Sequence, residues 1–96
     1  MSSNPSPDVN VQHNATAGRF EAVIGDHTAV AEYVIHGGRV VFTHTFVPNE
    51  LRGRGLAEQL VRAGLAWARA ERRKVIPQCS YVATFIERHP EYQDLL

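Results

Sequence analysis

The feature that most constrains the fold of this chain is a strand pattern that ends at a proline and leads, through a glycine loop, into a long helix pattern. Residues 39–47 (RVVFTHTFV) alternate between two faces, and their β-branched and aromatic side chains are typical of a strand. Pro48 has no amide hydrogen for a sheet ladder, so we expect the strand to end there. After the loop RGRGLA, apolar side chains recur at helical spacing through residues 55–73. This order predicts a right-handed crossover to a parallel strand.

Weaker patterns on both sides complete the predicted order of elements. Turn signals at Gly-Asp and Gly-Gly separate the strand patterns before residue 39, and Pro77 and Pro90 end the later elements. These elements are strands at residues 19–24, 28–35 and 74–80 and a short helix at residues 81–89, with Ser80 as its N-cap. We therefore expect an α+β (mixed α/β) domain at residues 18–96. It should contain an antiparallel three-stranded meander, a crossover helix, a parallel fourth strand and a short C-terminal helix (β-β-β-α-β-α).

The composition of the chain argues against several classes of protein. Residues 1–17 are rich in Ser, Asn and Pro, which predicts a flexible tail. A formal net charge of zero argues against a nucleic-acid binder, and a single cysteine excludes an internal disulfide framework. The sequence shows neither a membrane-span pattern nor a secretory-signal pattern. We expect a soluble, cytoplasmic monomer or weak dimer that binds no nucleic acid, membrane or metal.

The loop RGRGLA has the composition of an anion site. The first amide groups of a helix have no intrahelical partner and lie at its positive end. Gly53 and Gly55 would let an anion approach that backbone, and Arg52 and Arg54 add donors suited to phosphate oxygens. A bare strand-to-helix turn is the alternative interpretation of the same residues.

Two common nucleotide loops do not fit. A P-loop needs Lys followed by Ser or Thr after its last glycine, where this chain has Leu56 and Ala57. A dinucleotide fingerprint needs a small residue where Glu58 stands. It also needs an acidic residue after the next strand, where Gln78 and Cys79 stand.

A third pattern fits better. The loop follows R/Q-x-x-G-x-G/A, and together with HTFVP, IPQCSYV and RHPEY it resembles the GNAT acetyltransferase superfamily, in its minimal single-domain branch. The resemblance covers residues 19–96 and implies that acetyl-CoA is the co-substrate. It implies that loop amides hold the pyrophosphate, while the strand end pairs with the pantetheine arm. The implied cofactor-binding residues are Phe46, Val47, Arg52, Gly53, Arg54, Gly55, Leu56 and Ala57.

Two residues are candidates for catalysis. Cys79 stands just before the last helix, whose N-terminus would lower the pKa of the thiol. The resemblance places this cysteine near the cofactor thiol, as nucleophile or proton donor; a small buried hydrophobe is the alternative. His44 is predicted on the Phe42 face, as a general base or as a group that orients Cys79. A core histidine whose hydrogen bonds are satisfied is its alternative.

The predicted function is transfer of acetyl from acetyl-CoA to an unidentified amine, such as a lysine or the N-terminus of a peptide. One alternative is a module that binds or senses coenzyme A with little turnover. Another is an interaction domain that keeps only the fold. A basic cluster at Arg69, Arg72, Arg73 and Lys74 is interpreted as complementing the negative end of the long helix.

Overall fold

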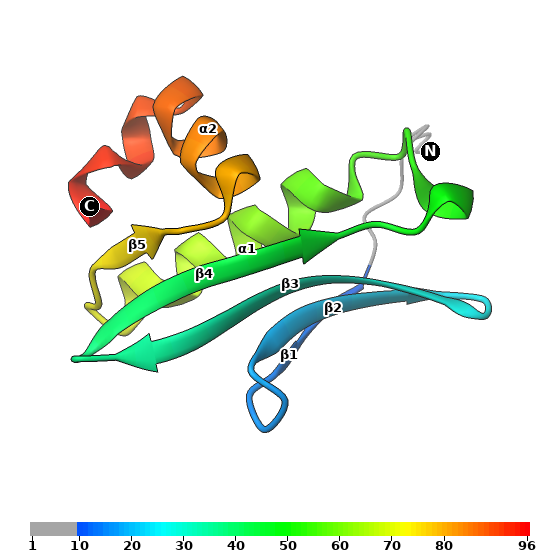
Figure 1. Ribbon diagram of the computed structural model, residues 1–96, viewed down its shortest axis with the longest axis horizontal. Helices are drawn as coiled ribbons and strands as arrows, with labels where there is room; N and C mark the ends of the chain where they lie inside the picture. Colours follow the sequence, from blue (N-terminus) through cyan, green and yellow to red (C-terminus); the bar gives the residue numbers. More distant parts are fainter. Residues whose placement is uncertain (1–9) are drawn as a thin grey trace, which may run out of the picture.

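The computed structural model describes residues 10–96, which form a five-stranded sheet in the order β1-β2-β3-β4-β5 with helices packed against it (Figure 1). The strands are β1 (Val11–Asn14), β2 (Arg19–Ile24), β3 (His27–His36), β4 (Arg39–Phe46) and β5 (Val75–Pro77). The helices are α1 (Leu56–Ala70) and α2 (Ser80–Arg88), with short 3-10 helices η1 (Asn49–Leu51) and η2 (Pro90–Leu95). The predicted α+β class and its β-β-β-α-β-α order are confirmed, with one further strand at the start.

Strand β1 corrects the prediction of a flexible tail to residue 17, of which residues 1–9 lie outside the described part. It pairs antiparallel with β2. The ring of His13 stacks on Phe20 at 4.1 Å between centroids, and its Nε2 lies 2.6 Å from the Tyr33 hydroxyl. These contacts lie outside the segment VQHN, whose local composition gave no sign of a strand.

The antiparallel meander and the parallel crossover agree with the expectation. Gly37 and Gly38, with φ of 59° and 79°, form the two-residue turn between β3 and β4. Both residues of this tight hairpin turn need positive φ, which glycine adopts at little cost. After α1, β5 returns parallel to β4, pairing Val40 with Val75 and Phe42 with Pro77.

Both helices pack on one face of the sheet. A single core joins inward-facing strand residues such as Phe20 and Phe42 with Leu60 of α1 and Phe85 of α2. Gly64 lies where α1 comes closest to the sheet, since a Cβ there would stand 2.8 Å from the Phe42 ring. We call the other side of the sheet, which no described helix covers, the open face.

The helix boundaries differ slightly from the prediction. Helix α1 ends at Ala70 rather than at residue 73, and Arg72 follows with a φ of 58°. Helix α2 includes Ser80, so its N-cap position is Cys79 rather than Ser80. The predicted cap was therefore wrong by one residue, and Cys79 lies at the very start of the helix.

Candidate functional site

The loop between β4 and α1 is open where an anion would approach. Gly53 and Gly55 have φ of 83° and 73°, and no heavy atom lies within 4 Å of the point where a Cβ of either would stand. Gly55 occupies the N-cap position of α1 and offers no side chain to the first amide groups of the helix. These amides therefore face a space that an anion could fill.

Beside this loop lies an open hollow of about 250 Å³. Its lining residues are Val47, Leu51, Arg52, Gly53, Gly55, Leu56, Ala57, Glu58 and Tyr81. Six of the eight predicted cofactor-binding residues thus share one surface. The other three lining residues, Leu51, Glu58 and Tyr81, were not predicted. Tyr81 lies on α2, which reaches the hollow only through the tertiary fold.

The other two predicted residues, Arg54 and Phe46, do not line the hollow. Arg54 is exposed, and the Phe46 side chain, 47% exposed, belongs to the open face. Arg52 Nε donates a hydrogen bond to the Val47 carbonyl at 3.2 Å, which ties the loop to the end of β4. Arg52 is therefore both a part of the hollow and a support for its shape.

Strands β4 and β5 part in front of this loop. Their pairing stops at Phe42 and Pro77, and the last link between them is the Cys79 amide, which donates to the Phe42 carbonyl at 2.9 Å. Strand β4 continues to Phe46 along β3 alone, while the chain after β5 turns away into α2 (Figure 1). Residues 43–46 of β4 thus have an edge that β5 does not cover.

Cys79 lies at this parting, next to Thr45. Its Sγ is 3.5 Å from the Thr45 hydroxyl, and the side chain is half-buried. Burial would raise the pKa of the thiol, but hydrogen bonds from the Thr45 hydroxyl and from the amides of Thr45, Tyr81 and Val82 outweigh it. The pKa of Cys79 lies below its ordinary value as a result.

The predicted placement of His44 on the Phe42 face is wrong. Opposite β3, Glu32 pairs with His44 but Tyr33 pairs with Phe42, so β4 contains one extra residue, Thr43. This β-bulge inverts the alternation after Phe42. His44 is consequently exposed on the open face, stacked on Phe46 at 6.4 Å, and Thr45 occupies the face toward Cys79.

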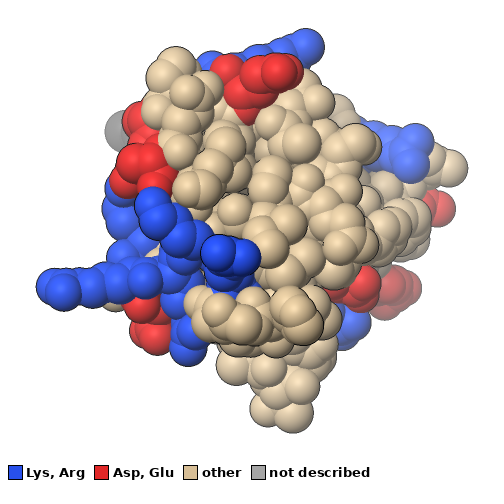
Figure 2. Space-filling view, turned by 60° about the vertical axis from the view of Figure 1, so that its left-hand side comes forward, with Lys and Arg blue, Asp and Glu red and all other residues tan. Residues whose placement is uncertain are grey.

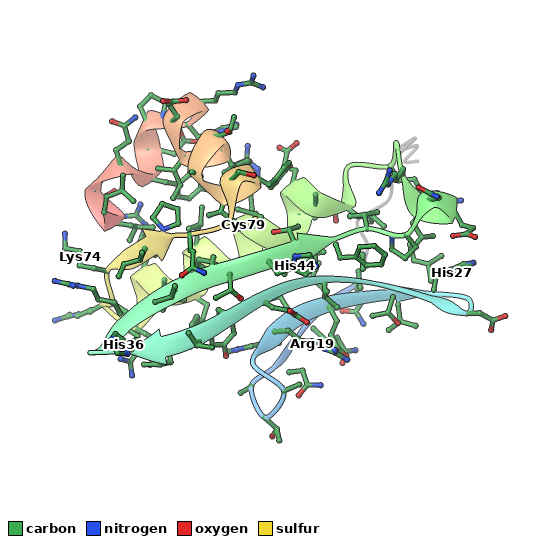
Figure 3. The ribbon with its side chains drawn as sticks, in the orientation of Figure 1. Arg19, His27, His36, His44, Lys74 and Cys79 are labelled. Carbon is green, nitrogen blue, oxygen red and sulfur yellow. The ribbon has the colours of Figure 1, made fainter. Side chains whose placement is uncertain are left out.

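No contact between His44 and Cys79 supports the hypothesis that His44 orients the thiol, since His44 lies on the open face. The side chain that does contact the thiol is that of Thr45, which the sequence analysis did not predict. Figure 3 shows Cys79 at the start of α2 and His44 along β4. The sequence shows three polar residues in a row, Thr43, His44 and Thr45. Which of these side chains points toward the thiol depends on the position of the bulge, and the pairing with β3 sets that position.

The basic cluster at the other end of α1 is tied into the fold. Arg69 pairs with Asp94 at 2.6 Å, and Lys74 Nζ donates to the Asp94 carbonyl at 2.7 Å. Arg73 donates to the Gly38 carbonyl at 3.0 Å. Lys and Arg side chains gather visibly on this end of the molecule (Figure 2). These contacts fasten η2 and the β3–β4 turn to the end of α1, in line with a structural role.

Two further features of the described residues bear on chemistry. Within residues 10–96, no three His, Cys, Asp or Glu side chains gather in a way that could hold a metal ion. In the same part of the chain, no helix has the length and apolar character needed to cross a bilayer.

Similar sequences support an assignment to a family. Residues 19–95 match the family model described as GCN5-related N-acetyl-transferase. Protein NATD1 of Xenopus tropicalis is 32% identical over 92 residues, which cover 93% of this chain and 84% of that protein. Protein NATD1 of Homo sapiens is 33% identical over 85 residues, which cover 85% of this chain and 75% of that protein.

A solved structure agrees with the fold. The solution structure of a GCN5-like protein from Staphylococcus aureus superposes with a TM-score of 0.72 and 24% identity, covering 93% of this chain and 88% of that one. At this identity the likeness concerns the fold alone. The family model and the NATD1 sequences go further, and the chain belongs to the GCN5-related N-acetyltransferase (GNAT) family.

Proposed function

We propose that this chain binds acetyl-CoA along the uncovered edge of β4 and transfers its acetyl group to an amine. The observation that carries the proposal is the parting of β4 and β5 after Phe42 and Pro77. This gap has the open α1 loop on one side and Cys79 on the other. Family membership supplies the class of co-substrate, an acyl-CoA, and the geometry supports where this chain would hold it.

The residues around the gap suit the parts of such a molecule. The free amides at the start of α1 and the Arg52 guanidinium would bind the pyrophosphate. The uncovered backbone of residues 43–46 could pair with the amide groups of the pantetheine arm. The thioester would then lie in the plane of the sheet, near Thr45 and Cys79.

A ligand in the plane of the sheet can be reached from both faces. We propose that the amine arrives from the open face, where His44 takes the proton from its nitrogen as the nitrogen attacks the thioester carbonyl carbon. The carbon–sulfur bond then breaks, and the Cys79 thiol, on the helix side, donates a proton to the leaving thiolate. The lowered pKa of Cys79 is also compatible with an acetyl-cysteine route, so the experiment must distinguish the two.

Binding is tested by calorimetry with acetyl-CoA on matched glycine variants. Gly55→Glu sets a carboxylate against the pyrophosphate and should weaken binding about 10- to 100-fold, the loss of one or two charge-assisted hydrogen bonds. Gly25→Glu is the control, because Gly25 has a similar φ of 60° and equally open surroundings in the β2–β3 turn. Equal affinities of the two variants would remove the loop from the proposal.

The chemistry is tested by intact mass after incubation with acetyl-CoA alone and with an amine panel. An adduct of one acetyl group that Cys79→Ala abolishes would establish the covalent route. Transfer to amines without an adduct would establish the direct route. A coenzyme A-binding module with little turnover is the second candidate, because the side chain that contacts the Cys79 thiol is Thr45, which could not activate that thiol as a base. Binding without transfer to any amine would favour it.

A further inference from the structure

Around His44, the open face carries two carboxylates, Glu21 and Glu32, and one guanidinium, Arg19. Arg19 and Glu21 point to this face from β2, and Arg19 Nε donates to the Glu21 carboxylate at 2.6 Å. Asn14 Nδ2 also donates to Glu21, at 3.3 Å. Glu21 is therefore satisfied within the protein, and hydrogen bonding lowers its pKa.

Glu32 differs from Glu21. It is half-buried on β3, opposite both His44 of β4 and Arg19 of β2 in the sheet register. The Arg19 guanidinium is engaged by Glu21, and within the described residues no ion pair or hydrogen bond joins the Glu32 carboxylate to another side chain. The Glu32 backbone is held at the bulge, where its carbonyl accepts from the Thr43 hydroxyl at 3.4 Å. Glu32 thus places a half-buried carboxylate opposite His44.

We propose that Glu32 is a specificity-determining residue that selects a basic peptide as acceptor. The inference rests on the proposed function, because it takes the uncovered edge of β4 next to His44 as the place of reaction. The side chain that Glu32 holds is a second cation on the peptide, such as an Arg or Lys next to the reacting lysine.

Strand spacing supports a second cation rather than the reacting nitrogen itself. Neighbouring strands lie about 4.8 Å apart, so Glu32 on β3 is two spacings, roughly 10 Å, from a ligand that pairs along the uncovered edge of β4. A carboxylate in contact with the reacting ammonium would also hold the proton that must leave. A cation several bonds away from the reacting nitrogen meets both requirements.

The surroundings of Glu32 favour an extended peptide. Val30 and Phe46, paired across β3 and β4, form an apolar step on the same face, and Phe46 is 47% exposed. The aliphatic stem of a lysine could lie on this step while its nitrogen reaches His44. Across the face, a hollow of about 150 Å³ lies over β1 and β2. The surface thus extends over four strands, or about 15 Å, which suits a chain of several residues better than a small amine.

The test compares two lysine peptides that differ only in one neighbouring residue, Arg or Gln, with acetyl-CoA as donor. The natural chain should show a KM about three- to fivefold lower for the Arg peptide, the size expected of a partly exposed ion pair, with similar kcat. Glu32→Gln should remove this difference and leave the Gln peptide unaffected. Glu87→Gln, an exposed carboxylate on α2, is the control and should keep the difference.

A binding measurement separates failure of this inference from failure of the proposed function. The Arg peptide should shift the amide resonances of Val30 to Glu32 even without acetyl-CoA, and Glu32→Gln should abolish those shifts. Turnover with no preference between the peptides, or a preference that survives Glu32→Gln, would overturn the role of Glu32. No turnover and no acetyl-CoA binding would overturn the proposed function, and the peptide shifts would then still decide whether Glu32 binds a cation.

Discussion

The two halves of β4 have the same length but differ in composition, RVVF against THTF, and lie in different surroundings. Residues 39–42, the closed half, lie between β3 and β5, and three of these four side chains are buried. Residues 43–46, the open half, lie along β3 alone, and none of their side chains is fully buried. The bulge at Thr43 marks the boundary. One strand thus anchors the core with one half and exposes polar groups along an uncovered edge with the other.

The largest expected difference between the halves is in stability. Phe42→Ala empties a site that is 1% exposed at the centre of the core, so the free energy of unfolding should fall by about 3–5 kcal/mol. Phe46→Ala, in the open half, should change it by no more than about 0.5 kcal/mol. Urea unfolding of the two variants measures both values. Similar losses in the two would show that the open half also belongs to the core.

A smaller loss is expected where α1 meets the closed half. Gly64→Ala places a methyl group 2.8 Å from the Phe42 ring, which should cost about 1–3 kcal/mol of overpacking. The better helix propensity of alanine offsets about 1 kcal/mol of this. We expect a net fall of up to about 2 kcal/mol in the free energy of unfolding, measured by urea.

Whether the Phe42 ring causes this loss is checked by making Gly64→Ala in a Phe42→Leu variant. Phe42→Leu shortens the side chain that the new methyl group would meet, so Gly64→Ala should be neutral or stabilising there. A loss that is the same in both backgrounds would show that Phe42 is not what requires glycine at this position.

The sequence was enough to predict the closed half and the order of elements from β2 to α2. Alternation in residues 39–42, Pro48 and the helical spacing after RGRGLA are local signals, and each corresponds to an element of the structure. Strand β1 was missed because VQHN has no alternation of apolar and polar side chains, while its pairing with β2 and the packing of His13 on Phe20 and Tyr33 appear only in the fold. Local patterns therefore predicted the framework and missed a strand that is recognised by its tertiary contacts.

The open half could not be predicted in the same way. Strict alternation assumes that each residue moves one step along the ladder, and the extra residue Thr43 breaks that assumption. His44 and Thr45 therefore lie on the faces opposite to those that strict alternation predicts. The glycine loop, in contrast, was recognisable because the glycines in RGRGLA are a local signal of a loop with positive φ. Gly53 and Gly55 both adopt the positive φ that favours glycine.

A chemical difference is expected within the open half. Thr45→Val removes a hydrogen bond that stabilises the Cys79 thiolate, so the pKa of Cys79 should rise. The rate of iodoacetamide alkylation against pH should then move to higher pH. Thr43→Val is the control, since the Thr43 hydroxyl bonds to Glu32 rather than to the thiol. Equal displacement by both variants would contradict the assignment of faces.

The same shift has a consequence for stability with a definite sign. A folded pKa below that of the unfolded thiol stabilises the folded chain above the unfolded value, and this contribution disappears as pH falls through the folded value. Thr45→Val should therefore lower stability at alkaline pH relative to the natural chain, with little change at neutral or acidic pH. Urea unfolding at several pH values measures the difference, and a loss confined to low pH would contradict the sign.

The smallest expected effect is that of His44→Gln on the thiol. His44 is exposed on the face away from Cys79, so the pH profile of alkylation should stay the same and the free energy of unfolding should change by no more than about 0.5 kcal/mol. Acetyl transfer, if His44 is the base, should nevertheless slow by about 10²-fold or more. A displaced alkylation profile would mean that imidazole and thiol interact across β4, and the separation of the two faces at the bulge would then be wrong. An unchanged profile with slowed transfer would show that the two residues act on the thioester independently, one from each face of the strand.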